Sequence, residues 1–204
     1  YDHMEFLGYD LTSITREKCG IFKDSAPVVM ANQLPEVAKI IEAEAKERSA
    51  DFIIGPNKAE MIDISIKDSD TSFTYNGCRM KTSLVGRHQI LNAQTAISAV
   101  KTLYPATATE NIRSALKNIR WPGRLQKLQV NPTVFYDVAH NAHGLKATLM
   151  TLKELYPDYK INAVCALKKS KELAPIADII KIYCKKIITT SIDDEAFWNC
   201  RLDT

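Results

Sequence analysis

Short apolar runs alternate with helical patterns along this sequence, and that alternation limits the fold more than any other feature. Residues 26–30 and 51–54 are apolar runs of strand length. Between them, residues 33–49 carry apolar side chains at helical spacing and charged side chains on the opposite side. A strand, a helix and a second strand in this order predict two parallel strands joined by a crossover helix. We therefore expect an α/β fold.

The same alternation returns in the last part of the chain. The predicted elements are strands at 133–137, 161–167 and 186–190 and helices at 144–155 and 171–183. This order is typical of a Rossmann-like, doubly wound sheet. Because the pattern stops after the third strand, we expect an incomplete Rossmann-like domain over residues 121–204.

Residues 61–85 have a different pattern, in which apolar and polar residues alternate one by one. Such alternation predicts antiparallel strands with one buried face. The Asn76-Gly77 pair predicts a two-residue hairpin turn between two of these strands. A helix is predicted next, at 90–104, and a first domain over residues 1–120 would contain all of these elements.

Two further helices of this domain have recognisable end signals. One covers residues 11–20 and the other ends at residue 119. Gly20 is a typical C-terminal stop for the first of them. The expected N-terminal caps are Thr12 or Ser13 for the first helix and a Thr107–Glu110 capping box for the second.

Composition excludes several classes of partner. The 204 residues are 46% hydrophobic and 25% charged, which is typical of a soluble globular chain. The net charge of +3 is too small, and no basic run is long enough, to predict nucleic-acid binding. Five scattered cysteines form no CxxC pair and no metal-ligand spacing, which favours reduced thiols in the cytoplasm. No apolar run reaches transmembrane length and no signal peptide is visible, so we expect no membrane partner.

Residues 121–143 combine polar groups in a way that predicts a ligand site. Pro122-Gly123-Arg124 places a guanidinium just after a rigid turn. The predicted strand at 133–137 ends in Asp137 and is followed by His140. Ligands of open α/β sheets bind outside the carboxyl ends of the strands. Asn141 fits this site and fits equally well the N-cap of the following helix.

The chemistry of these groups suits a nucleotide. Arg124 offers a planar fork for phosphate oxygens, and Asp137 at a strand end can accept hydrogen bonds from ribose hydroxyls. Asn92, at the start of a helix, could bond an adenine edge or a phosphate. The sequence has neither a GxGxxG motif nor a P-loop, so each of these signals is weak by itself.

Five segments, taken together, give the sequence a specific resemblance. They are YDHMEFLG, ITREKCGIF, GRHQILNAQTA, WPGR and DVAHNAH. In order and spacing they resemble the carboxyl-terminal half of the folylpolyglutamate synthase and dihydrofolate synthase family, within the Mur ligase superfamily. The resemblance implies the distal part of a P-loop-type Mur ligase central domain over residues 1–120. An incomplete Rossmann-like carboxyl-terminal domain would then occupy residues 121–204.

The resemblance implies an ATP-dependent ligase that adds L-glutamate to a folate, or also to dihydropteroate, through an acyl phosphate. It implies ATP and Mg²⁺ as cofactors, small-molecule substrates and a monomer when full length. His3 would be a Mg²⁺ ligand, and Lys18, carbamylated, would support the metal and act in catalysis. Asn92, Arg124 and Asp137 would contact the nucleotide. His140 would be catalytic, lying against the phosphates or the substrate.

Plainer interpretations stay open beside these. Imidazole is a poor ligand for Mg²⁺, so His3 also fits a loop hydrogen bond. Lys18 also fits a solvated helix position, and Cys19 a packing position. Two other functions are open: a Mur-type ligase for a peptidoglycan precursor, and a non-enzymatic remnant that binds nucleotide weakly or not at all.

We expect the chain as given to be a fragment without ligase activity, because no residue of it supplies the P-loop that holds the β- and γ-phosphates. We also expect exposed sheet edges and poor solubility. We further expect Arg124 and Asp137 to face one cleft between the domains, with His3 and Lys18 close together and facing it too.

Overall fold

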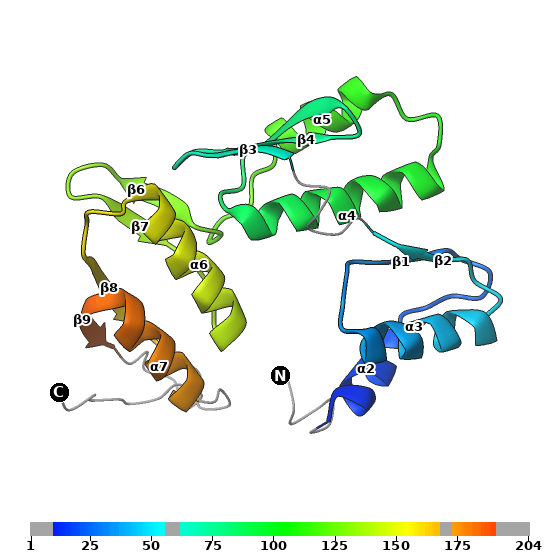
Figure 1. The fold of residues 1–204 in the computed structure, drawn as a ribbon, viewed down its shortest axis with the longest axis horizontal. Coiled ribbons are helices and arrows are strands. Elements are labelled where there is room, and N and C mark those ends of the chain that lie inside the picture. The colour runs from blue at the N-terminus through cyan, green and yellow to red at the C-terminus, as the bar shows by residue number, and fades with distance from the viewer. Residues whose placement is uncertain (1–9, 56–61, 168–172, 191–204) are drawn as a thin grey trace. The chain divides into compact units, whose positions relative to one another are not determined.

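The structure is a computed structural model that describes residues 10–55, 62–167 and 173–190. The chain divides into two compact units, one that ends at Trp121 and one that begins at Pro122. Figure 1 shows the helices and strands of both units. Each unit is considered by itself below. Within the described ranges, no helix is both long and apolar enough to cross a membrane.

The described part of the first unit starts with a helix, which is followed by a strand, helix, strand arrangement. Its elements are α2 (Leu11–Cys19), β1 (Val28–Met30), α3 (Pro35–Glu47) and β2 (Phe52–Ile54). Strands β1 and β2 pair in parallel, with Val28 opposite Phe52 and Met30 opposite Ile54. Helix α3 is the crossover between them, as the sequence predicts, and Ala45 on its inner side is fully buried.

The capping of α2 differs from the prediction. Asp10, rather than Thr12 or Ser13, is the N-cap, and its carboxylate accepts a hydrogen bond from the backbone N–H of Ser13 at 2.8 Å. The hydroxyl of Ser13 bonds the same carboxylate, so it reinforces the cap instead of forming it. Gly20 ends the helix as expected, although with a right-handed backbone (φ −56°) that needs no glycine.

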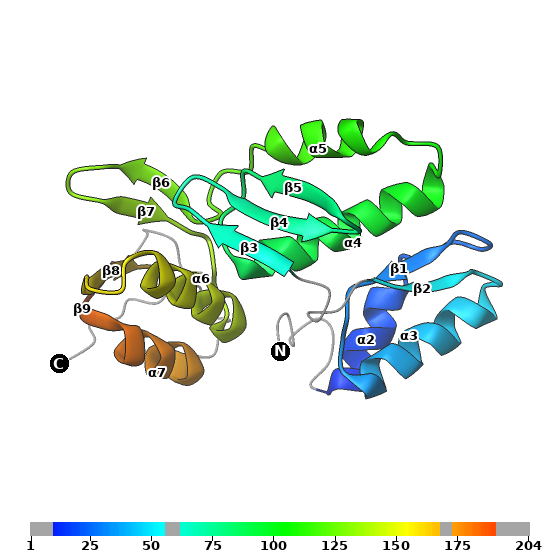
Figure 2. The ribbon, with the colours of Figure 1, turned by 45° about the horizontal axis from the view of Figure 1, so that its top comes forward.

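An antiparallel sheet and two helices follow in the described part of this unit. They are β3 (Ile62–Ile66), β4 (Thr71–Tyr75), β5 (Cys78–Thr82), α4 (Arg87–Leu103) and α5 (Thr109–Lys117). Asn76 and Gly77 form the predicted turn between β4 and β5, both with positive φ (47° and 71°), as a type I′ turn requires. Figure 2 shows the sheet beside α4 and α5. The core between them consists of Phe73, Met80, Ile90, Ala93, Ile97, Ile112 and Leu116.

The two helix starts in this region were predicted incorrectly. Helix α4 begins at Arg87, three residues before the predicted position, directly after Gly86, whose φ of 117° favours glycine. Helix α5 begins at Thr109 after Ala108, and no side chain caps it. The expected capping box is therefore wrong, and Glu110 forms an ion pair with Arg113 at 3.2 Å instead.

The described residues of the second unit form four strands and two helices. They are β6 (Gln126–Gln129), β7 (Val134–Tyr136), α6 (Ala142–Leu155), β8 (Ile161–Cys165), α7 (Leu173–Tyr183) and β9 (Cys184–Thr189). Strands β8 and β9 pair in parallel, as a Rossmann-like unit requires. Strand β7 pairs with β6 in an antiparallel hairpin, and within the described ranges it is not hydrogen-bonded to β8. The sequence did not predict β6, because three of its four residues are polar.

One buried side chain in the first unit is not satisfied. Gln94 on α4 is fully buried, and neither its amide nitrogen nor its amide oxygen has a hydrogen-bond partner. Gln89, one turn earlier and 5% exposed, differs in this respect. Its Oε1 accepts from Asn92 at 3.0 Å, and its Nε2 lies 2.9 Å from Nε2 of His88. A buried amide without partners loses its hydration and gains nothing in return.

The replacement Gln94→Met, which keeps the length of the side chain and removes the amide, should therefore stabilise the first unit. We expect the free energy of unfolding to rise by roughly 1–3 kcal/mol, the desolvation penalty of an unpaired polar group. Urea denaturation monitored by circular dichroism would measure it. The matched change Gln89→Met removes a bonded amide and should lower stability. A loss of stability in Gln94→Met would contradict the interpretation.

Candidate functional site

The β6–β7 hairpin brings together the two sequence segments that predict a ligand site. In the antiparallel register Gln126 lies opposite Tyr136. The residues just before β6 therefore lie beside those just after β7, and the N–H of Val138 donates to the carbonyl of Gly123 at 2.9 Å. Residue 124 is consequently a close neighbour of residue 137, although 12 residues separate them in sequence.

Asp137 holds the backbone of this corner. Its Oδ2 accepts a hydrogen bond from the N–H of Leu125 at 2.7 Å, and its Oδ1 accepts one from the N–H of Ala139 at 2.8 Å. Leu125 is buried and has a left-handed backbone with φ of 44°. That conformation is unfavourable for leucine, so the bond from Asp137 helps to maintain it.

Gly123 is required by the same corner. Its φ is +75°, and a Cβ at this position would lie 2.7 Å from Cγ1 of Val138 and 3.3 Å from Cε1 of Tyr136. Any other residue would have a strained backbone here and would force the side chain of Val138 to shift. The Pro-Gly-Arg sequence therefore sets the close approach of the two ends of the hairpin.

Arg124 is exposed on the outside of the corner, and no residue in the described ranges pairs with it. His140 is also exposed, and its Nδ1 donates to the carbonyl of Val138 at 3.0 Å. A carbonyl can only accept, so Nδ1 carries the proton and Nε2 is the nitrogen directed elsewhere. The corner thus presents a cation and an imidazole from a fixed backbone.

Asn141 has the plainer of its two predicted roles. It is the N-cap of α6, and its Oδ1 accepts from the N–H of Gly144 at 2.8 Å. Asn141 is therefore a structural cap of the helix, as the alternative interpretation predicted.

Asn92 lies on α4 in the first unit, in the second turn rather than at the helix start, because α4 begins at Arg87. Its side chain is exposed, and its Nδ2 donates to Oε1 of Gln89. His88, Gln89 and Asn92 form a chain of polar side chains along the first two turns. A nucleotide contact by Asn92 stays a prediction.

Lys18 is exposed on α2, and its neighbour Cys19 is 1% exposed. Burial raises the pKa of the Cys19 thiol, and the nearby Glu44 carboxylate adds to this effect, so the thiol stays neutral. Cys19 is therefore a packing residue, as predicted. His3 lies outside the described residues, and its closeness to Lys18 stays a prediction.

Among the described residues, no group of three or more histidine, cysteine, aspartate or glutamate side chains could hold a metal ion. An unmodified lysine ammonium repels a cation, so Lys18 as it stands does not supply a ligand. The described residues therefore do not fit a complete magnesium site by themselves.

Comparison with known proteins finds one matching domain family and several related proteins. Residues 123–199 match the Mur ligase glutamate ligase domain. The dihydrofolate synthase/folylpolyglutamate synthase of Bacillus subtilis is 32% identical over 190 residues, which cover 89% of this chain and 44% of that protein. The folylpolyglutamate synthase of Lacticaseibacillus casei is 29% identical over 187 residues, covering 87% of this chain and 43% of that protein.

Solved structures show the same relationship. An FPGS–AMPPCP–folate complex has a TM-score of 0.83 and 25% identity, covering 95% of this chain and 50% of that one. Mycobacterium tuberculosis folylpolyglutamate synthase complexed with ADP has a TM-score of 0.84 at 24% identity, covering 97% and 46%. The chain spans less than half the length of the two curated relatives.

The distal part of the chain is thus a Mur ligase glutamate ligase domain within a mixed α/β fold. The chain as a whole is a homologue of the folylpolyglutamate and dihydrofolate synthases over most of its length. The family resemblance predicted from the five sequence segments is confirmed.

Replacing Asp137 by asparagine should loosen the corner. An amide has one acceptor oxygen, so one of the two backbone N–H groups would face an NH₂ group and lose its partner. We expect a loss of roughly 1–3 kcal/mol in the stability of the second unit, and faster hydrogen exchange at Leu125 or Ala139. Asp158→Asn, at an exposed position, is the control. Unchanged exchange at both amides would contradict this role of Asp137.

Replacing Gly123 by alanine should destabilise the same unit through two effects, the positive φ and the contact with Val138. The φ contribution is on the order of 1–2 kcal/mol. In a double-mutant cycle, Val138→Ala should relieve only the contact, so the double variant should be more stable than additivity predicts. Urea denaturation of the four proteins would measure this coupling, and strict additivity would count against the close approach.

Proposed function

We propose that this chain is the distal part of an ATP-dependent ligase that adds L-glutamate to a folate. In the proposed reaction a folate carboxylate attacks the γ-phosphorus of ATP, forming an acyl phosphate and releasing ADP. The amine of glutamate then attacks the acyl carbon, phosphate leaves, and the amine loses a proton. The observation that carries the proposal is the Asp137-held corner, which lies within the matched Mur ligase domain and presents Arg124 to solvent.

The names of the relatives support the substrate class. The related proteins are folylpolyglutamate or dihydrofolate synthases, and the solved complexes hold ADP, AMPPCP or folate. These names favour the folate branch over ligases of peptidoglycan precursors. They also support glutamate and ATP as the other small-molecule substrates of the proposed enzyme.

The corner residues have distinct proposed roles. Arg124 would pair its guanidinium with phosphate oxygens of the nucleotide and so neutralise charge that develops during phosphoryl transfer. Asp137 would keep the Arg124 backbone in place, and any bond to ribose would use its remaining lone pairs. His140, with Nδ1 bound to Val138, would direct Nε2 toward a phosphate or the substrate. Asn92 is proposed as a contact of the adenine.

Magnesium enters the proposal only as the ion that accompanies ATP. Its proposed ligand His3 and a carbamylated Lys18 would need further oxygen ligands, because the described residues form no cluster that binds a metal. We place the protein in the cytoplasm, as a monomer when full length. The reduced thiols of Cys19, Cys78, Cys165 and Cys184 support that compartment.

The experiment is a phosphate-release assay with ATP, Mg²⁺, a reduced folate and L-glutamate. The chain alone is expected to show no turnover. A chimera that joins it to the part of the Bacillus subtilis synthase that it does not match should release phosphate only when both folate and glutamate are present. Arg124→Ala in the chimera should lower that rate by on the order of 10²–10³, the usual effect of losing one charge-stabilising donor.

Arg113→Ala is the matched control. This arginine is exposed on α5 and forms only a surface ion pair, so its loss should leave the rate unchanged. A folded chimera whose rate does not depend on glutamate would contradict the proposed reaction. Equal rates for Arg124→Ala and the parent chimera would contradict the role of the corner.

A further inference from the structure

The first unit contains a cavity that the proposed ligase reaction does not use. It lies among the β4–β5 hairpin, α4, α5 and Ile53 of β2, and its volume is about 470 Å³. Cavities of this size hold small organic molecules. The cavity reaches the last turn of α4 at Lys101, nine residues after Asn92 and roughly 14 Å further along the helix axis. It is therefore separate from the end of α4 that is proposed to contact nucleotide.

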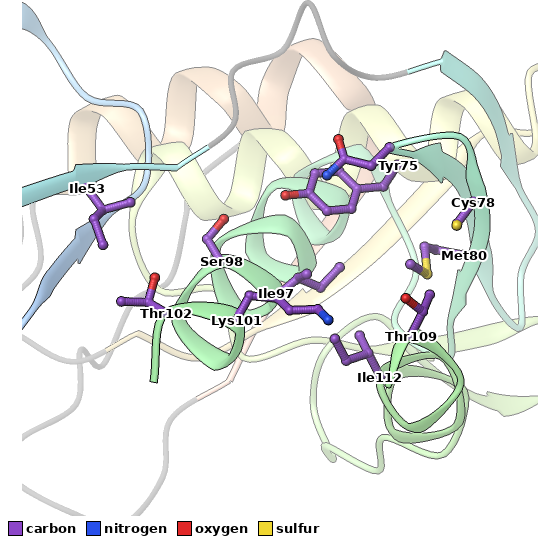
Figure 3. A pocket seen from close by; sticks show the side chains of 11 residues that line it. Ile53, Tyr75, Cys78, Met80, Ile97, Ser98, Lys101, Thr102, Thr109 and Ile112 are labelled. Carbon is purple, nitrogen blue, oxygen red and sulfur yellow. The ribbon is translucent and has the colours of Figure 1, made fainter. Parts of the chain in front are cut away.

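The floor of the cavity is apolar. Met80 of β5, Ile97 of α4 and Ile112 of α5 line it, and all three belong to the buried core of the unit. Figure 3 shows them on the hairpin side and on the two helices around the cavity. A ligand that fills this space would need an apolar body. A polar group placed against these side chains would lose its hydrogen bonds to water and find no partner to replace them.

The rim of the cavity is polar and has unused hydrogen-bonding groups. The hydroxyls of Tyr75, Ser98 and Thr102 line the cavity, and none of them bonds to another residue in the described ranges. Tyr75 enters from the hairpin and the other two from α4 (Figure 3). Each of these hydroxyls can donate one hydrogen bond to a ligand in the cavity.

The charge at the rim has one sign. Lys101 is half-buried, and its ammonium donates one hydrogen bond to the carbonyl of Thr107. Figure 3 shows this side chain extending from α4 toward Ile112 of α5. An ammonium has three protons, so two are left for a ligand. None of the described residues that line the cavity is acidic. The local charge therefore favours an anion.

From these observations we infer that the cavity binds a small amphipathic organic anion, with its apolar body on Met80, Ile97 and Ile112 and its carboxylate at Lys101. Tyr75 and Ser98, which also line the cavity, offer hydroxyl donors to other polar groups of such a ligand. A charge-assisted hydrogen bond in a half-buried position is stronger than a neutral one, so the charge decides the class of ligand.

The test uses the whole chain labelled with ¹³C at the methionine methyl groups. Met80 lines the cavity, whereas Met30 and Met150 do not, so each protein carries its own reference signals. The probe is naphthalene-2-carboxylate, and the neutral comparison is naphthalene-2-methanol. We expect the carboxylate to shift the Met80 signal in a saturable way, with Met30 and Met150 unchanged. The alcohol should bind roughly tenfold more weakly, the factor that about 1.4 kcal/mol represents.

Three variants assign the effect to the cavity. Lys101→Met should remove the preference for the carboxylate, and Lys117→Met, which takes one charge from the exposed end of α5, should not. Thr102→Asp places a negative charge at the rim while Lys101 keeps its bond to Thr107, so it should weaken the carboxylate even if Lys101→Met fails to fold.

Several outcomes would overturn the inference. The first is equal affinity for the acid and the alcohol, and the second is the same loss of preference for the acid in Lys117→Met as in Lys101→Met. The third is an affinity for the acid that Thr102→Asp leaves unchanged. The fourth is a Met80 signal that does not shift at any probe concentration up to its solubility. A shift shared by all methionines would also overturn it, because it would show unspecific binding of the probe to exposed apolar surface.

Discussion

The two hydrogen bonds that the Asp137 carboxylate accepts determine the arrangement of the candidate site. One fixes the backbone that follows Arg124 and the other fixes the backbone that leads to His140. Without them, the left-handed backbone of Leu125 and the backbone at Ala139 would each have to be maintained by packing alone. The carboxylate therefore performs a structural task in the corner, whatever it contacts in a ligand complex. Loss of activity on mutation of this residue would by itself not distinguish these two tasks.

In the first unit, helix α4 is the element that holds the polar groups in place. One of its sides completes the core with Phe73 and Met80 of the antiparallel sheet. Its first two turns carry the polar chain from His88 to Asn92, and its last turn carries Lys101 at the cavity. A single rigid element thus carries polar groups at both ends, while its middle is held by apolar packing.

The sequence predicted most elements of the fold because their apolar periodicity is strong. The β1–α3–β2 crossover is present as expected because its two strands and its helix each have a clear apolar pattern, and the Asn76-Gly77 hairpin because its turn signal is local. Strand β6 was missed because its polar residues gain their strand conformation by pairing with β7, which no local pattern shows. The Thr107–Glu110 box failed for a related reason: the helix starts after Ala108, so the threonine lies outside it.

The candidate site was predictable in its residues and less so in its roles. The motifs named Arg124, Asp137 and His140, and the hairpin register explains why they lie together. The bonds from Asp137 to two backbone amides were not predicted, and the sequence left Asn141 between a site role and a cap role, because both depend on which N–H group a short side chain reaches.

The close approach of Gly123 to Val138 also affects the entropy cost of binding a ligand. The corner loses its conformational entropy when the unit folds, so that loss is already complete before any ligand arrives. Binding then orders only the side-chain torsions of Arg124, on a backbone that is already in its final conformation. A cation on such a preorganised backbone loses less conformational entropy on binding than one on a flexible loop, so its affinity for a ligand is higher.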